Sequence, residues 1–146
     1  MRSAQPYLNF PGNAEEAFGF YRDLFGAGEL TILRFRDLGA PDGMPEEEAN
    51  MVANLALPLG DGSMLMASDV PPSLGGSVTF GDHAYVMLSP DDREEAERVF
   101  AGLAAGGTVG MELQTTAWAE AYGTCTDRFG VPWMINYEGN VRFEMP

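Results

Sequence analysis

The chain has 146 residues, of which 45% are hydrophobic and 11% aromatic, enough to build the core of one domain or of two small modules. Its 22 acidic and 8 basic side chains leave a net charge of −14, which excludes the basic stripe that neutralises nucleic-acid phosphates. Because no apolar run has the length of a membrane span and the first residues form no signal-peptide core, we expect a cytoplasmic protein that binds neither nucleic acid nor membranes.

The first half of the chain predicts one strand, one helix and three further strands. In chain order these are a strand at residues 7–10, a helix that Asn13 caps and Gly26 or Gly28 ends, and strands at residues 30–35, 50–59 and 63–67. Residues 39–48 are a loop or a single helical turn, and Asp61-Gly62 is a hairpin turn. The pattern is therefore βαβββ.

The second half predicts the same order of elements. A Pro-, Gly- and Ser-rich stretch precedes it, and its elements are a strand at residues 83–89, a helix from the cap Asp92 to Leu103, and strands at residues 108–113, 122–126 and 131–137. We therefore expect a first module at residues 1–70, a linker at 71–82, a second module at 83–138 and a tail at 139–146.

A diverged internal repeat supports this division. Residues 7–29 fall on residues 86–108 when the chain is shifted by 79 positions, so that a strand, a Pro turn, a capped helix and a Gly stop recur without a gap. The fold class we predict is α+β, with two βαβββ modules whose strands form a curled mixed sheet around a cleft and whose helices lie outside.

Several segments carry a family resemblance. Residues 6–10, 12–17 and 65–69, together with Trp118 and the closing segment 126–136, resemble the PhnB-like branch of the vicinal-oxygen-chelate superfamily, which includes glyoxalase I, extradiol dioxygenases and bleomycin-resistance proteins. Methyl transfer in the ubiquinone pathway is one activity attributed to that branch. The sequence gives this activity no support, because no Gly-rich nucleotide loop follows a strand of a parallel sheet.

The resemblance implies a divalent metal held by His and carboxylate side chains on the first and last strands of each module. Carried onto this chain, those positions fall at Pro6, Met66, Tyr85 and Met134, none of which is a good ligand for a hard or borderline divalent ion. We therefore expect neither a family-type metal centre nor a cofactor.

The chain has a single histidine and a single cysteine. His83 is a candidate acid or base in the cleft, although a bond to Asp82 or to the backbone is the simpler interpretation. Cys125 lies in a predicted strand with no His near it in sequence, so a buried inert thiol is the favoured interpretation.

The predicted cleft lining rests on strand alternation and on the resemblance. The residues expected to bind a ligand are Leu8, Phe10, Asn54, Met66, His83, Tyr85, Met87, Trp118, Tyr122, Met134 and Asn136. Apolar and aromatic walls with a few polar groups suit a small organic molecule, and the net charge of −14 makes a cation one candidate. The alternative is that the cleft is filled as core, with Met as gap-filler.

Three functions remain open from the sequence. The first is a metal-free protein that binds a small organic molecule, and the second is a lyase, isomerase or dioxygenase with a non-standard metal site. The third is an interaction module with a closed core. A homodimer is expected in each case, because members of this fold often assemble cavities from paired modules.

Overall fold

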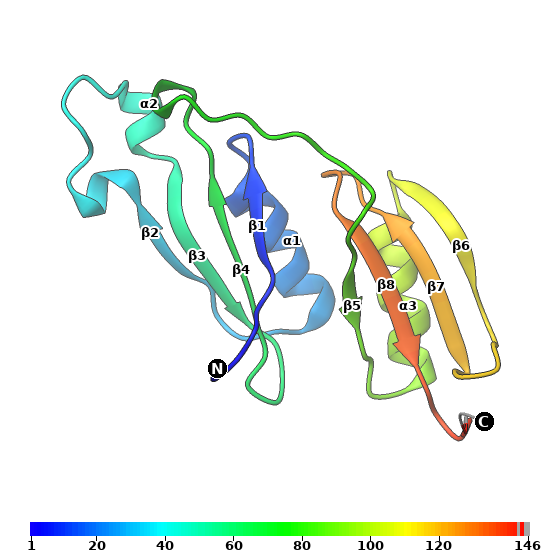
Figure 1. The fold of residues 1–146 in the computed structure, drawn as a ribbon. Coiled ribbons are helices and arrows are strands. Elements are labelled where there is room, and N and C mark those ends of the chain that lie inside the picture. The colour runs from blue at the N-terminus through cyan, green and yellow to red at the C-terminus, as the bar shows by residue number, and fades with distance from the viewer. Residues whose placement is uncertain (143, 145–146) are drawn as a thin grey trace. The chain divides into compact units, whose positions relative to one another are not determined.

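The computed structural model describes residues 1–142 and 144. The chain divides into two compact units, Met1–Thr79 and Phe80–Pro146, and each unit contains one four-stranded sheet and one long helix (Figure 1). The predicted fold class of two βαβββ modules is confirmed. Each unit is described here by itself.

The first unit contains sheet 1, in the strand order β1-β4-β3-β2. Its elements are β1 (Tyr7–Phe10), α1 (Ala14–Phe25), β2 (Thr31–Arg34), the 3-10 helix η1 (Phe35–Leu38), α2 (Glu46–Ala49), β3 (Val52–Pro58), β4 (Met64–Asp69) and the 3-10 helix η2 (Pro72–Leu74). Strands β1 and β4 are parallel, whereas β3 is antiparallel to both β2 and β4. Residues 39–48 were expected to form a loop or a single helical turn. The short helix α2 shows that the helical turn is correct for the end of this segment.

The second unit repeats this topology in sheet 2, in the strand order β5-β8-β7-β6. Its elements are β5 (Val86–Leu88), α3 (Arg93–Ala104), β6 (Thr108–Gln114), β7 (Ala121–Thr126) and β8 (Pro132–Tyr137). Strands β5 and β8 are parallel, and the other two pairs are antiparallel. The predicted strand at 83–89 is thus shorter than expected, and His83 and Tyr85 precede it.

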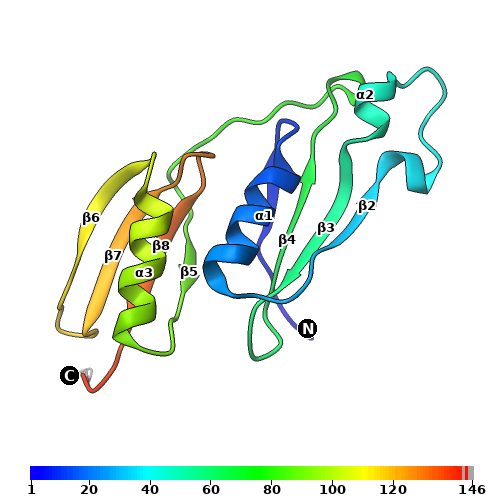
Figure 2. The same ribbon diagram turned by 180° about the vertical axis from the view of Figure 1, so that it is seen from behind.

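One face of each sheet is covered by the long helix of its own unit, as the views from the two sides show (Figures 1 and 2). Alternation along the strands sends one set of side chains under the helix and the other set to the opposite face. In the first unit Phe10, Leu55 and Leu65 are fully buried with Phe18 and Tyr21 of α1. In the second unit Trp133, Ile135 and Leu103 form the corresponding core. We call the helix-free side of each sheet its open face.

The two long helices begin with different caps. Asp92 caps α3 locally, as predicted, because its side chain accepts a 2.8 Å hydrogen bond from Glu95 N. Asn13 holds the N-cap position of α1, but its side chain makes no capping bond. Instead Asp69, at the end of β4, accepts from Ala14 N at 3.0 Å and from Val52 N at 3.0 Å, so one buried carboxylate joins α1, β3 and β4.

A second buried carboxylate shapes the turn between β7 and β8. Asp127 Oδ1 accepts from Phe129 N and Val131 N at 2.9 and 3.0 Å, and its Oδ2 accepts from Trp133 Nε1 at 2.8 Å. These hydrogen bonds give a structural reason for several residues of the closing segment 126–136, which carried the family resemblance. That segment therefore has a structural role in building a turn, and it supplies no catalytic carboxylate to solvent.

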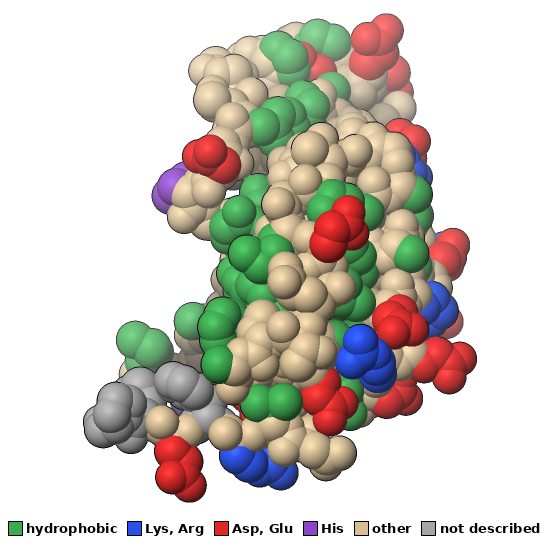
Figure 3. All heavy atoms as spheres, turned by 90° about the vertical axis from the view of Figure 1, so that its right-hand side faces the viewer, with side chains coloured by type: hydrophobic (Ala, Val, Ile, Leu, Met, Phe, Trp, Pro, Cys, Tyr) green, Lys and Arg blue, Asp and Glu red, His purple; other side chains and the backbone are tan. Residues whose placement is uncertain are grey.

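Acidic side chains predominate over basic ones on the surface drawn in Figure 3, with hydrophobic side chains among them. This fits the net charge of −14. In the part of the chain that the structure describes, no helix combines the length and apolar character that a membrane span requires.

Candidate functional site

The open faces of both sheets are free of formal charge at every register-paired position. Paired residues on neighbouring strands point to the same side of a sheet, so the strand registers assign each face. The open face of sheet 1 comprises Tyr7, Asn9, Thr31, Leu33, Asn54, Ala56, Pro58, Met64, Met66 and Ser68. The open face of sheet 2 comprises Met87, Thr108, Met111, Gln114, Tyr122, Thr124, Thr126, Pro132, Met134 and Asn136.

None of these side chains is charged, and none is fully buried within its own unit. In a chain with 30 charged side chains, 22 acidic and 8 basic, these faces are therefore depleted of charge. Charged residues are depleted where surfaces lose their water on binding.

Sheet 1 carries a small polar cluster on its open face. The Tyr7 hydroxyl donates to Asn54 Oδ1 at 3.3 Å. The phenol of β1 therefore reaches over β4 to a residue of β3. Beside it, Ser68 Oγ donates to Asn9 Oδ1 at 3.4 Å. Both bonds are longer than the normal range for O–H···O bonds and lie among exposed or half-buried groups, so a ligand can replace them at little cost.

Sheet 2 carries an aromatic and Met-rich cluster instead. The rings of Trp118 and Tyr122 meet edge to face, with centroids 5.2 Å apart and planes at 77°. Met87 is 57% exposed and is the register partner of Met134 on β8. Thioether and aromatic side chains of this kind form adaptable apolar surfaces, which suits an organic ligand.

The structure places the predicted ligand residues in three groups. Asn54 and Met66 lie on the open face of sheet 1, and Met87, Tyr122, Met134 and Asn136 lie on that of sheet 2. Trp118 lies in the loop before β7, against Tyr122. His83 and Tyr85 are exposed in the segment before β5 and belong to neither set of paired positions.

The face assigned to Leu8 and Phe10 is wrong. Phe10 is 0% exposed and packs edge to face on Phe18 of α1, with ring centroids 5.9 Å apart. Leu8 pairs with Ala67 and shares the helix-covered face. Tyr7 and Asn9 hold the open face in their place, since neighbouring residues of a strand point to opposite sides.

The connection from β5 to α3 is one residue shorter than the connection from β1 to α1, and this difference explains the error. Tyr7 precedes the first residue of α1, Ala14, by seven positions, whereas Met87 precedes Arg93, the first residue of α3, by six. The shift of 79 positions therefore aligns the helices, but it displaces β1 against β5 by one residue. A slip of one residue exchanges the two faces of a strand.

The alternation of β1 itself contained the missed signal. Tyr7 and Asn9 are polar, and Leu8 and Phe10 are apolar, which is the pattern of a strand with one solvated face. Ser68, on β4, was missed for a different reason, because a lone Ser has no signature in sequence.

Neither the expected ligand positions (Pro6, Met66, Tyr85 and Met134) nor the register partners of the two Met residues fit a divalent metal ion. On β1 the register partner of Met66 is Tyr7, and on β5 the partner of Met134 is Met87. The four side chains at this level are one phenol and three thioethers, whereas hard and borderline ions take carboxylate or imidazole. Among the described residues, no three His, Cys, Asp or Glu side chains are grouped so that they could hold a metal ion.

Cys125 is buried, as its sequence context indicated. The thiol is free and 1% exposed. Burial first, and then the negative charge of Asp127, raise its pKa from 9.0 to about 11. His83 makes no hydrogen bond or ion pair with Asp82 or with any other residue that the structure describes.

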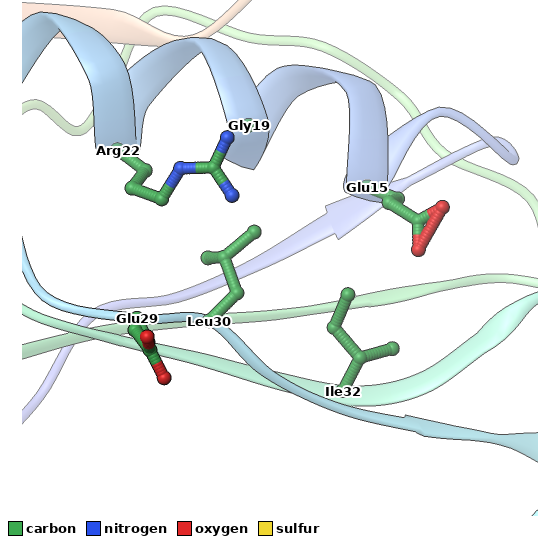
Figure 4. A pocket seen from close by; sticks show the side chains of 6 residues that line it. All are labelled: Glu15, Gly19, Arg22, Glu29, Leu30 and Ile32. Atoms are coloured by element: carbon green, nitrogen blue, oxygen red, sulfur yellow. The ribbon is translucent and has the colours of Figure 1, made fainter.

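A separate groove lies between α1 and the strand segment that leads into β2. It has a volume of about 480 Å³ and is lined by Glu15, Gly19, Arg22, Glu29, Leu30 and Ile32. Leu30 and Ile32 point toward the helix, and Gly19 leaves the opening that a side chain would fill (Figure 4). Two of its three charged side chains are already engaged, because Glu15 pairs with Arg34 at 2.5 Å and Arg22 with Asp23 at 3.0 Å. We therefore place the candidate site on the open faces.

Residues 2–136 match the model of a protein family described as 3-demethylubiquinone-9 3-methyltransferase. The chain belongs to this family. It is 36% identical over 141 residues to Protein YjdN from Escherichia coli K12, a match that covers 90% of this chain and 92% of that protein.

Solved structures agree with this assignment. Protein PA1353 from Pseudomonas aeruginosa is 39% identical with a TM-score of 0.79, over 93% of this chain and 98% of its own. A putative 3-demethylubiquinone-9 3-methyltransferase, PhnB protein, from Bacillus cereus shares the fold, with a TM-score of 0.71 at 24% identity over 93% and 99% of the two chains. The PhnB-like branch that the sequence resembled fits the family whose model matches this chain.

More distant proteins share this fold. The fosfomycin resistance protein FosX from Listeria monocytogenes shares it at 10% identity, with a TM-score of 0.60 over 94% of both chains. A likeness at this level of identity concerns architecture, and the function has to be argued from the side chains of this chain.

Proposed function

We propose that this protein binds a small organic molecule on the open faces of its sheets, and that its own side chains hold that molecule without a metal ion. The observation that carries the proposal is the complete absence of charge from the register-paired positions of both faces. Aromatic and Met side chains supply apolar contact there, and Tyr7, Asn9 and Asn54 supply hydrogen bonds.

We propose further that the ligand carries no formal charge. The net charge of −14 would attract a cation in solution. At the face itself no carboxylate or guanidinium stands at a paired position to compensate a charge that loses its water. Desolvation therefore opposes an ion of either sign.

A thermal-shift screen of small organic molecules tests this proposal, after elemental analysis of the protein as purified. We expect less than one-tenth of a transition metal per chain, and a rise in melting temperature with some neutral aromatic or heterocyclic compounds. A stoichiometric metal that survives dialysis, or a melting temperature that no compound raises, would overturn the proposal.

The screen needs a site-specific control. Met134→Lys places a charge on the open face of sheet 2, and Asn54→Lys places one on that of sheet 1. Ala101→Lys introduces the same charge at an exposed position of α3 and serves as the matched control elsewhere. The Lys variant on the face that holds the ligand should abolish the rise in melting temperature. The control variant should preserve it.

We propose a homodimer as the assembled form. Its support is the extent of the exposed uncharged surface, since Leu33, Met111 and Met87 are all more than 40% exposed. Light scattering after gel filtration measures the assembly directly, and a mass of one chain at micromolar concentration would overturn it. If the two copies covered the open faces, the charge variants above would also dissociate the dimer.

A further inference from the structure

Two carboxamides on the open face of sheet 1 present hydrogen-bond donors that nothing in the described structure satisfies. Asn54 receives the Tyr7 hydroxyl on its Oδ1 at 3.3 Å, and Asn9 receives the Ser68 hydroxyl on its Oδ1 at 3.4 Å. Each carboxamide has one acceptor oxygen and one NH2 group with two donors. The two hydroxyls thus engage both oxygens and orient both nitrogens away from themselves.

Neither Asn9 Nδ2 nor Asn54 Nδ2 donates to any residue that the structure describes. The rest of the face contains no acceptor with a formal charge, since the neighbours Leu33, Ala56 and Met66 are apolar. The local surface therefore offers N–H groups on an apolar floor, which is the complement of an acceptor oxygen on an apolar body.

The spacing of the strands indicates how many oxygens this site can take. Asn9 is on β1 and Asn54 is on β3, with β4 between them. Two strand spacings separate their backbones by roughly 9–10 Å. This backbone separation suits two oxygens carried by one rigid molecule, one near each carboxamide.

The side chains at the expected metal positions make the carboxamide donors important for binding an oxygen. The positions where the resemblance implied metal ligands carry a proline, a phenol and two thioethers, which cannot polarise an oxygen as a divalent ion does. Carboxamide N–H groups bind the same oxygens by hydrogen bonding alone, and they do so without demanding that the oxygen be charged.

We infer that Asn9 and Asn54 bind the two carbonyl-type oxygens of an uncharged, planar ligand, one oxygen to each carboxamide. This inference rests on the proposed function, because it names the chemical class of the molecule that the open face takes. Tyr7 and Ser68 are positioning residues, since they act by holding the carboxamide oxygens.

Side-chain amide signals in a ¹H–¹⁵N correlation spectrum of the full chain report directly on this site. The probes are three benzene derivatives of graded oxygen content: 1,4-diacetylbenzene, acetophenone and ethylbenzene. We expect the NH2 signals of Asn9 and Asn54 both to shift with the diketone. Each carbonyl should tighten the dissociation constant about fivefold, the value of one neutral hydrogen bond.

Near-isosteric variants separate the two amides. Asn9→Leu and Asn54→Leu should each remove about fivefold of the diketone's affinity and leave that of ethylbenzene unchanged. Asn140→Leu, at an exposed position in the C-terminal tail, is the matched control and should leave all three affinities unchanged. Tyr7→Phe should weaken the diketone less than Asn54→Leu, because it frees the carboxamide and does not remove it.

The outcomes distinguish this inference from the proposed function. If ethylbenzene shifts the methyl signal of Met66 and binds as tightly as the diketone, the face binds organic molecules but the inference is wrong. Tighter binding of benzoate or benzylammonium than of acetophenone would likewise overturn the uncharged class. If none of the probes shifts any signal of the open face, the inference is wrong, and the proposed function then depends on the wider screen.

Discussion

The indole Nε1 of Trp133 donates a 2.8 Å hydrogen bond to the carboxylate Oδ2 of Asp127, and both residues are buried. The same carboxylate accepts from the backbone at Phe129 and Val131, so a side chain of β8 and the turn before it share one acceptor group. A buried carboxylate is tolerated here because several donors compensate its lost hydration.

Trp133→Phe should lower the free energy of unfolding by about 1–3 kcal/mol, since it leaves Asp127 Oδ2 without its indole donor. Trp118→Phe is the matched control, because Trp118 is 45% exposed and its replacement should cost under about 0.5 kcal/mol. Urea denaturation followed by far-ultraviolet circular dichroism measures both. Equal stability of the two variants would show that the Trp133 bond contributes nothing.

The face assignment of β1 predicts a large loss of stability for one aromatic residue and a small loss for another, three positions away. Phe10→Ala removes a fully buried ring and should destabilise the protein by about 3–5 kcal/mol. Tyr7→Ala removes a ring that is 46% exposed and should cost no more than about 1 kcal/mol. If Tyr7→Ala proved the more damaging change, the strand would have the other side inward.

Loss of the Asp69 carboxylate should lower the free energy of unfolding more than loss of the local cap Asp92. Asp69→Ala leaves two amides without an acceptor, Ala14 N at the start of α1 and Val52 N at the start of β3, at a combined cost of about 3 kcal/mol. Asp92→Ala removes one exposed capping bond and should cost about 1 kcal/mol. Thermal and urea unfolding of the two variants compare them directly, and a ranking in the reverse order would contradict this account of the cap.

The thiol of Cys125 should resist alkylation in the folded protein at pH 8. Burial, and secondly the charge of Asp127, raise its pKa to about 11, so the reactive thiolate is scarce and enclosed. Iodoacetamide should modify Cys125 only when guanidinium unfolds the chain. Rapid labelling without denaturant, followed by mass spectrometry, would contradict this prediction.

The same shift has a consequence for stability at high pH. Because the folded pKa lies above the unfolded value of 9.0, the folded state holds the thiol proton more tightly than the unfolded state does. This favourable contribution is present below pH 9.0 and is lost as the pH rises toward about 11. The wild type should therefore lose more unfolding free energy over this interval than Cys125→Ala. Parallel losses in the two proteins would show that Cys125 does not titrate with folding.

Much of the fold followed from local patterns in the sequence. The caps, Gly stops and alternation placed both βαβββ modules, because hydrophobic period and turn residues act over a few neighbouring positions. The burial of Cys125 followed from its place in an apolar strand. The lack of a second imidazole told against a family-type metal site before any geometry was known.

The tertiary structure decided which side of each strand is open and which polar groups meet there. The partner of Asn54 is Tyr7, 47 positions away, and the cap of α1 is Asp69, 55 positions beyond Ala14. Both contacts depend on the pairing of β1 with β4, which no local pattern specifies. A difference of one residue between the two strand–helix connections was enough to assign β1 the wrong face. Local patterns determine elements because their causes lie within a few residues. Faces and partners are determined by strand register, which is settled only when distant segments pack together.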